Sequence, residues 1–480
     1  MNAPQASGHL EPQVFADYLA RTRWFAGKGR PFTVTGVRTV GEVPGRVEDS
    51  PRVVIHLVQV GYSDVTADAV DAVELYQVPL AYYEHPEARL DHAFVGWWED
   101  PEHGWVHAYD ALHDREAMAC WLRSFDEAAA QEHGHTVDPE TMLTFHRLPG
   151  HDLDPEASST LFTGEQSNSS VAFGEDALMK VFRKVTPGVN PDVAVHEVLT
   201  RAGSDHVASL YGWLDVLDPD SEAVIQLAML QQFLRTAIDG WDMALGSVRS
   251  LFADPELHAN QSGGDFAGEA TRLGEALREL HETLRESFGT EAVDASRLAA
   301  LMGERLAAAE TVVPDLREHH DALARLHGRV AGLGRIEVHR IHGDLHLGQT
   351  LRTSKGWKLV DFEGEPAKPL AERMLPDSPW RDVAGMLRSF DYAPHAVERD
   401  RDEEDKAGAA QRSVRADEWA NRAANHFLTA YAGGSLTDEQ QILLDAYIAD
   451  KAVYETVYET RNRPAWVDIP LQAVARIGAE

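Results

Sequence analysis

Apolar and polar residues alternate most clearly in the first quarter of the chain. Residues 72–80 alternate apolar with polar side chains, as a half-buried strand does, and residues 52–60 form a second, more apolar strand-like segment. A helical stretch follows from Asp114 to about Ala130. The pattern predicts a small α/β unit over residues 1–98.

A second group of strand signals begins after Pro155. Residues 169–173 and 177–182 are apolar segments separated by a short polar turn, which predicts a hairpin. The segment 187–192 contains two prolines and a glycine and ends on an aspartate, so we expect a turn followed by a helix start. Residues 223–230 predict one more apolar strand.

Helical periodicity dominates from Thr236 onward. Leu273, Ala276, Leu277 and Leu280 recur at helical spacing and predict one buried helix face. Residues 398–406 are a run of charged side chains, which is typical of a solvated loop.

Composition narrows the possible partners. The chain has 480 residues, 44% of them hydrophobic, and a formal net charge of -34. Such a charge repels phosphate backbones and anionic lipid surfaces, so we expect no nucleic-acid or membrane partner. The single Cys120 excludes an internal disulfide. The absence of an early basic segment and of a long apolar run predicts no secretory signal, hence a cytoplasmic protein.

The strongest chemical signal is the segment 342–349 (HGDLHLGQ) followed by 359–363 (LVDFE). Phosphoryl transfer to an alcohol needs one carboxylate to orient the hydroxyl and take its proton, and further oxygen ligands to hold magnesium. Asp344 fits the first role, and Gln349 and Asp361 fit the second. A lone loop aspartate is more often a turn or cap residue; the three together at this spacing favour chemistry.

These two segments resemble the catalytic and metal loops of the aminoglycoside phosphotransferase-like kinases. The resemblance implies an α+β, two-lobed protein-kinase-like fold with a mostly helical C-terminal lobe. It also implies ATP and Mg²⁺ as cofactors. Two departures stand out: Gln349 replaces the usual asparagine, and Phe362 is followed by Glu363 instead of glycine. Glu363 is either an added metal ligand or part of a divergent loop.

The same resemblance assigns the nucleotide-binding residues. Lys180 lies on an apolar strand, where a lysine can pair with α- and β-phosphate oxygens. Residues 164–170 precede it and, with Ser167 and Asn168, are candidates for a phosphate-covering loop. An ordinary hairpin turn is as compatible with this local sequence.

Two further assignments concern the partner of Lys180 and the adenine. Glu197 and Asp192 both qualify as its acidic partner, and we prefer Glu197. Gln231 and Phe233 lie in a segment that resembles the interlobe hinge, where backbone groups would meet the adenine.

Outside the kinase motifs, several stretches resemble the actinobacterial maltokinases. They are residues 23–30, 263–269, 377–386 and 450–464. The resemblance spans nearly the whole chain and implies transfer of phosphate from ATP to the anomeric hydroxyl of maltose, giving maltose 1-phosphate for α-glucan synthesis. We expect a cap over residues 1–98, the rest of the N-lobe over 99–232 and the C-lobe over 233–480.

The sugar site is predicted from the same resemblance. Tyr454 and Tyr458 are four residues apart and share a helix face, where aromatic rings can lie against glucose units. The predicted substrate residues are His342, His346, Asp391, Tyr392, Tyr454, Glu455, Tyr458, Glu459 and Arg461. From the pattern alone, the tyrosines are equally compatible with core packing, and Arg388 with Asp391 forms an alternative structural ion pair.

Two other functions remain open at this point. An aminosugar kinase, such as a glucosamine kinase, shares the catalytic segments and differs in the sugar pocket. A catalytically dead pseudokinase that binds a partner, for example a trehalose synthase that interconverts trehalose and maltose, is disfavoured by the presence of Lys180, Asp344 and Asp361.

Overall fold

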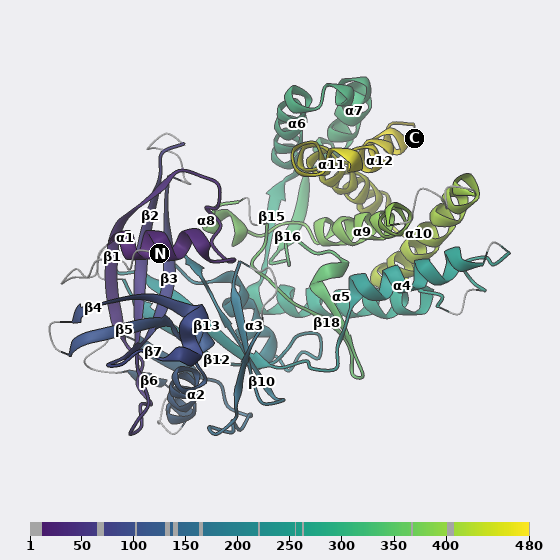
Figure 1. Ribbon diagram of the computed structural model, residues 1–480. Helices are drawn as coiled ribbons and strands as arrows, with labels where there is room; N and C mark the ends of the chain where they lie inside the picture. Colours follow the sequence, from purple (N-terminus) through teal and green to yellow (C-terminus); the bar gives the residue numbers. More distant parts are fainter. Residues whose placement is uncertain are drawn as a thin grey trace. The chain divides into compact units, whose positions relative to one another are not determined.

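The structure is a computed structural model, and the chain divides into two compact units (Figure 1). The first unit comprises residues 1–197 and 208–235, and the second comprises residues 198–207 and 236–480. The structure describes residues 12–64, 72–100, 103–129, 135–137, 143–162, 167–218, 221–254, 256–261, 264–365, 368–400 and 408–479.

The first unit begins with a helix and an antiparallel sheet, drawn in purple and blue in Figure 1. The sheet has the order β1-β2-β3-β5-β4, and β11 pairs with β3 at a separate point. The elements are α1 (Pro12–Arg21), β1 (Phe32–Glu42), β2 (Arg52–Tyr62), β3 (Val73–Tyr83), β4 (Phe94–Asp100), β5 (Gly104–Asp110) and β11 (Lys184–Val185).

Helix α1 covers one face of this sheet because its apolar side is continuous. Phe15, Tyr18 and Leu19 are buried and join a cluster with sheet residues such as Val58 and Tyr76. Removal of this aromatic surface from water is the main favourable contribution to the folding of the cap.

A second antiparallel sheet completes the first unit. Its order is β6-β7-β12-β13-β10-β9-β8. The elements are α2 (Arg115–Ala129), β6 (His135–Val137), β7 (Leu143–Arg147), β8 (Ser159–Leu161), β9 (Ser169–Phe173), β10 (Ala177–Val181), α3 (Pro191–Arg201), β12 (Leu210–Leu217) and β13 (Val224–Gln232). The predicted hairpin is confirmed as β9 and β10, which pair from Ser169 with Val181 to Phe173 with Ala177.

Buried polar contacts join the two sheets of the first unit. The Gln77 side chain donates to the backbone oxygens of Phe182 and Leu227 at 3.0 and 2.9 Å. Arg183 Nη2 donates to Asp110 Oδ2 at 2.7 Å, and both side chains are 1% exposed. The guanidinium of Arg183 also lies over the ring of Trp24. Polar groups this deeply buried are stabilising only while they remain paired.

The second unit is mostly helical, with short strands before and after residues 342–349. The helices are α4 (Gly240–Ala253), α5 (Ala267–Phe288), α6 (Ala295–Val312), α7 (His320–Ala331), α8 (Leu370–Arg373), α9 (Trp380–Arg399), α10 (Ala409–Ala432), α11 (Asp438–Asn462) and α12 (Asp468–Ala479). The strands are β14 (Ile238–Asp239), β15 (Thr290–Asp294), β16 (Arg335–His339), β17 (Thr350–Thr353) and β18 (Gly356–Leu359).

Helix α11 packs against α6, α7, α9 and α12 (Figure 1). A capping box fixes its start: Thr437 Oγ1 accepts from the Gln440 backbone, and the Gln440 side chain accepts from the Thr437 backbone. The first turn of α11 is therefore fixed, and the side chains along this long helix have defined positions in the unit.

The sequence-predicted elements agree with these observations. The strands predicted at 52–60 and 72–80 are β2 and β3, and the predicted apolar face of α5 is buried. The expected boundary at residue 98 falls inside β4, because the first sheet continues to Asp110. Of the charge run, residues 398–399 end α9 and residues 401–406 lie outside the described residues. Within the described parts, no helix is both long and apolar enough to cross a membrane.

Candidate active site

The predicted catalytic loop, residues 342–349, lies between β16 and β17 in the second unit, and Asp382 of α9 holds its backbone. The Asp382 carboxylate accepts from the backbone N–H groups of His342 and Gly343 at 2.7 and 2.8 Å. Gly343 has φ +88°, a conformation that glycine adopts without strain. His281 contacts the same carboxylate at 3.1 Å and Tyr431 through its other ring nitrogen. The buried carboxylate of Asp382 therefore fixes the backbone conformation of the loop.

A second glycine allows α9 to approach this loop closely. A Cβ atom on Gly385 would lie 2.4 Å from the backbone oxygen of Leu345, which is too close for any other residue. The residue before Leu345 is Asp344, and its side chain is 23% exposed.

Lys451 of α11 forms an ion pair with Asp344. Its Nζ donates to Asp344 Oδ1 at 3.2 Å and lies over the ring of Tyr454 at 5.4 Å from the centroid. Burial alone would raise the pKa of Asp344, but Lys451 and the nearby His346 lower it to below its ordinary value. Asp344 is therefore ionised at neutral pH, as a proton acceptor must be.

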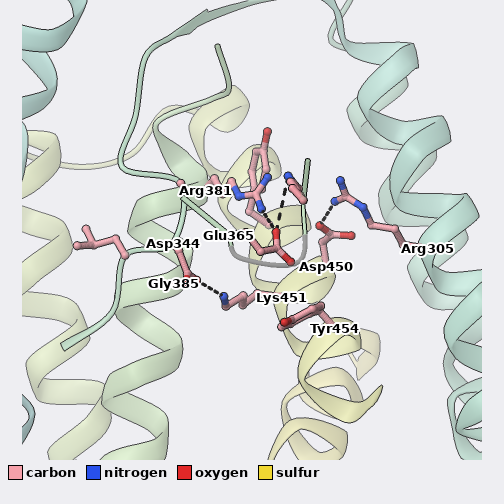
Figure 2. Close-up of a pocket in the computed structure, with 12 residues that line it drawn as sticks. Arg305, Asp344, Glu365, Arg381, Gly385, Asp450, Lys451 and Tyr454 are labelled. Atoms are coloured by element: carbon pink, nitrogen blue, oxygen red, sulfur yellow. Dashed lines mark hydrogen bonds and ion pairs between the residues drawn. The ribbon is translucent and has the colours of Figure 1, made fainter. Parts of the chain in front are cut away.

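Asp344 lines a pocket within the second unit (Figure 2). Charged and tyrosine side chains make up most of its wall. The lining residues are Arg305, Gly343, Asp344, Leu345, Glu365, Lys368, Arg381, Gly385, Tyr447, Asp450, Lys451 and Tyr454. A polar wall with aromatic rings suits a ligand that carries many hydroxyl groups.

Gln349 and Asp361 come together beside the catalytic loop. The Gln349 side-chain amide lies 3.1 Å from Asp361 Oδ2. Asp361 has φ +68°, an uncommon value for a residue with a side chain, and such strain occurs at functional positions. Glu363 follows two residues later and is half-buried. Two carboxylates and an amide oxygen are the ligand types that Mg²⁺ prefers, so these residues fit the expected ion.

The two histidines of the loop are held by the loop itself. His342 is 1% exposed, and its Nε2 contacts the backbone oxygen of Val360 at 2.9 Å. His346 Nδ1 accepts from the backbone of Gly348 at 3.1 Å, and burial lowers its pKa. Neither is among the residues that line the pocket. The predicted sugar contacts of both histidines stay a prediction; in the structure both side chains bond to the backbone of the loop and of the segment after β18.

Four other predicted substrate residues belong to a largely buried charge network instead. Arg388 Nη1 lies 2.5 Å from Asp391, and Arg388 Nη2 lies 2.7 Å from Glu455. Tyr392 donates to Glu459 at 3.3 Å. None of the four carboxylate or phenol partners lines the pocket. The alternative of a structural Arg388–Asp391 ion pair is confirmed, and the network extends it to Asp391, Tyr392, Glu455 and Glu459.

The two tyrosines of α11 share one face, as predicted. Their rings stack with centroids 6.5 Å apart, and both side chains are exposed. Tyr454 lines the pocket, whereas Tyr458 is one turn beyond the lining. Arg461 is exposed and also lies outside the lining. The pattern of spacing thus located one pocket residue among these three.

In the first unit, Lys180 of β10 pairs with Asp192 of α3. The Nζ–Oδ2 distance is 2.8 Å, and Asp192 Oδ1 lies 3.0 Å from His196 Nδ1. Burial would raise the pKa of Asp192, but Lys180 and His196 more than offset it and hold that pKa far below its ordinary value. The preference for Glu197 as the partner is therefore corrected to Asp192.

The remaining nucleotide candidates lie at the ends of the strands around Lys180. Ser167 and Asn168 immediately precede β9, and residues 164–166 lie outside the described residues. Gln231 pairs with Leu210 at one end of the β12–β13 ladder, and the backbone N–H of Phe233 donates to the backbone oxygen of Asp176 at 2.8 Å. These positions leave the hinge assignment as a prediction.

The sequence interpretation missed most of the pocket. Arg305, Glu365, Lys368, Arg381 and Lys451 received no role, and neither did the loop clamp at Asp382. One signal was available: Lys451 is three residues before Tyr454, so on a helix the two side chains share a face. The others come from three separate segments, and their meeting depends on tertiary packing.

Comparison with known proteins identifies the N-terminal region. Residues 18–114 match the family described as the maltokinase N-terminal cap domain. The matched residues lie within the first unit. This match covers the end of α1, the sheet through β5 and the turn that follows, which agrees with the continuation of the sheet beyond residue 98.

The capped chain is also similar to glucosamine kinases. It is 29% identical to one from Streptacidiphilus jiangxiensis over 64% of this chain and 70% of that protein. It is 26% identical to another from Mycolicibacterium smegmatis over 64% of this chain and 76% of that protein. A solved glucosamine kinase in complex with glucosamine, ADP and inorganic phosphate superposes with a TM-score of 0.64, covering 98% of this chain and 100% of that one, at 20% identity.

These similarities confirm the predicted fold class. The chain has an α+β fold with an N-terminal sheet cap and a mostly helical C-terminal region, and it shares this fold with a kinase. The two-lobed kinase-like fold implied by the resemblance of the loops 342–349 and 359–363 agrees with this structural similarity.

Proposed function

We propose that this protein is a sugar kinase that transfers the γ-phosphoryl group of ATP to the anomeric hydroxyl of maltose, giving maltose 1-phosphate for α-glucan synthesis. The observation that carries the proposal is the position of Asp344: an ionised carboxylate on a preorganised loop lines a polar pocket. The maltokinase-type cap supports maltose as the acceptor.

Asp344 acts as the proton acceptor in this proposal. Its carboxylate accepts a hydrogen bond from the sugar hydroxyl and takes the proton as the hydroxyl oxygen bonds to the γ-phosphorus. The bond between that phosphorus and the β-γ bridging oxygen breaks, and ADP leaves with the bridging oxygen. Asp382 keeps the loop in place during this step, because its carboxylate holds two backbone N–H groups.

The first unit binds the nucleotide. Lys180 extends from β10 to the α- and β-phosphate oxygens, and Asp192 orients it. Ser167 and Asn168 contact the phosphates from the loop before β9. Backbone groups around Gln231 and Phe233 contact the adenine.

Gln349, Asp361 and Glu363 would hold Mg²⁺. An ion held there would supply positive charge to offset the negative charge that develops during phosphoryl transfer. The 3.1 Å separation of the Gln349 amide and Asp361 supports a shared ligand role. Gln349 stands where an asparagine is usual in the superfamily. Its side chain is one methylene group longer than that of asparagine, so its amide reaches further.

Tyr454 contacts the acceptor. Its exposed ring lies at the pocket wall beside Lys451, where it can cover the apolar face of a glucose unit. An enzyme that converts trehalose to maltose would supply the acceptor, and such a trehalose synthase is a candidate partner.

A second candidate is phosphorylation of glucosamine. It is supported by both curated relatives, which are glucosamine kinases. The two candidates share the catalytic loop and differ in the acceptor.

Measurement of ADP release with ATP and Mg²⁺ separates the candidates. Maltose, glucosamine, glucose and no sugar are compared at equal concentrations. We expect turnover with maltose and a product phosphate that is stable to alkali and labile to acid, as an anomeric phosphate is. Turnover with glucosamine but not maltose would replace the first candidate by the second. Absence of turnover with every sugar would contradict both and favour a pseudokinase.

A further inference from the structure

Every carboxylate that lines the pocket already faces a cation. Asp344 pairs with Lys451 at 3.2 Å, and Asp450 pairs with Arg305 at 2.6 Å. Glu365 lies 2.6 Å from Arg381 (Figure 2). Lys368 is a second cation near Glu365, at 3.7 Å. Among the described lining residues, four cations therefore face three carboxylates.

This charge arrangement determines which sugars can bind. An ammonium group needs a carboxylate that is free of another cation, because a buried positive charge is stable only when it is paired. In this pocket an ammonium would compete with a lysine or an arginine for each carboxylate. Hydroxyl groups meet no such conflict, since a paired carboxylate keeps acceptor lone pairs and a guanidinium keeps donors.

We propose that Lys451 is a specificity-determining residue that makes the pocket selective for uncharged sugars against sugars with an ammonium group. This inference rests on the proposed sugar kinase function and deepens it. Lys451 is singled out because its Nζ contacts the carboxylate to which the reacting hydroxyl binds. An ammonium that approaches Asp344 meets Lys451 at close range, where like charges repel strongly.

Position and contacts restrict the movement of Lys451. Its stem leaves α11 next to Asp450, which Arg305 holds, and its Nζ rests over the Tyr454 ring. Burial alone would lower the pKa of Lys451, but Asp344 and Glu455 raise it to above its ordinary value, so the side chain stays charged. A cation in a fixed position is what selection against another cation requires.

The test compares two sugars that differ in one group. Glucose and glucosamine have the same ring, with a hydroxyl or an ammonium at one carbon, so their ratio isolates charge. Each is measured as an acceptor by kcat/KM and as a competitive inhibitor of maltose phosphorylation by its inhibition constant. The variants are Lys451→Gln, which removes the charge, and Lys451→Arg, which keeps it. Lys355→Gln, on the exposed turn between β17 and β18, is the control for loss of one positive charge elsewhere.

The wild type should favour glucose over glucosamine, and Lys451→Gln should reduce that preference by about tenfold or more. Lys451→Arg and Lys355→Gln should preserve it. If Lys451→Gln no longer turns over any sugar, binding of the two sugars by calorimetry gives the same ratio. An unchanged ratio with maltose turnover intact in the wild type would overturn the role of Lys451 and leave the kinase proposal standing. A wild type that prefers glucosamine would overturn both the selectivity and maltose as acceptor.

Discussion

Each unit of the protein contains a lysine paired with an aspartate, and the two pairs differ in their surroundings. Lys180–Asp192 in the first unit has a 2.8 Å contact and an aspartate that is 2% exposed. Lys451–Asp344 in the second unit has a longer contact of 3.2 Å, and Asp344 faces a pocket. In both pairs the lysine lowers the aspartate pKa against the effect of burial.

The different exposure of the two aspartates shows how the same type of ion pair can serve two purposes. Asp192 contacts Lys180 and His196 and is almost fully buried, so in the proposed function it holds the lysine in one place. Asp344 has an open side, so it can exchange part of its interaction with Lys451 for a substrate hydroxyl. Burial separates an orienting carboxylate from a reacting one more clearly than charge does.

Of the substitutions that test this comparison, Asp344→Asn should reduce kcat the most. The amide cannot take a proton, so kcat should fall by about 10³-fold or more, while nucleotide affinity stays close to that of the wild type. Steady-state kinetics with maltose and equilibrium binding of ADP measure the two quantities. Turnover within a few-fold of the wild type would remove Asp344 from the reaction.

Lys180→Met should reduce kcat/KM for ATP by about 10²-fold, because one charged contact to the phosphates is lost. The fall should appear with every sugar acceptor, unlike the change at Lys451, which depends on the acceptor. Kinetics at varied ATP with saturating maltose test this. A fall that appeared only with one acceptor would contradict the assignment of Lys180 to the nucleotide.

Arg388→Met should act on stability and leave sugar affinity unchanged. The change leaves Glu455 without its cation in a mostly buried network, which should lower the free energy of unfolding by about 3 kcal/mol. Denaturant unfolding and the KM for maltose at a permissive temperature are the measurements. Arg272→Met is the matched surface control and should cost less than about 1 kcal/mol, since Glu269 keeps Arg352. A large rise in the KM for maltose in Arg388→Met would indicate that Glu455 belongs to the sugar site.

The pH dependence of kcat/KM should depend on Lys451. Asp344 must be ionised to accept a proton, and its pKa is below the ordinary 3.8, so the wild type should show no loss from this group between pH 5 and 8. In Lys451→Gln, burial acts without the main opposing charge, and the acid limb should move to higher pH. An acid limb in the same place in both proteins would show that Lys451 does not set the ionisation of Asp344.

Tyr454→Ala should have the smallest effect. Loss of one exposed ring from the pocket wall should raise the KM for maltose by roughly three- to tenfold, in line with the burial of part of one aromatic side chain. Tyr458→Ala is its control, since that ring lies beyond the lining, and its KM should stay near that of the wild type. Equal effects would extend the sugar site along α11.

The sequence indicated the local parts of this fold well. Strand alternation located β2 and β3, helical spacing located the buried face of α5, and the loops 342–349 and 359–363 brought Gln349 together with Asp361. These features depend on neighbours within about 20 residues in sequence. The kinase resemblance was readable for the same reason, because its motifs are short and contiguous.

Long-range pairing explains what the sequence left undetermined. Lys451 meets Asp344 across 107 residues, and Arg305 meets Asp450 across 145. Glu455 is the neighbour of Tyr454 in sequence but points to a different side of α11, where Arg388 of α9 binds it. A row of aromatic and acidic residues on one helix therefore does not reveal which side faces the pocket and which faces the next helix.

The buried pair of Arg183 and Asp110 limits which parts of the chain can be lost or exchanged during evolution. Asp110 ends β5, whereas Arg183 lies in the short link between β10 and β11, 73 positions away in sequence. A shortened gene that lost the cap would leave the Arg183 guanidinium in an apolar interior without its carboxylate or the Trp24 ring. Recombination that exchanged caps between relatives would give a stable protein only where both residues of this ion pair were retained. The cap and the strand that carries Lys180 are thus expected to travel through evolution as one piece.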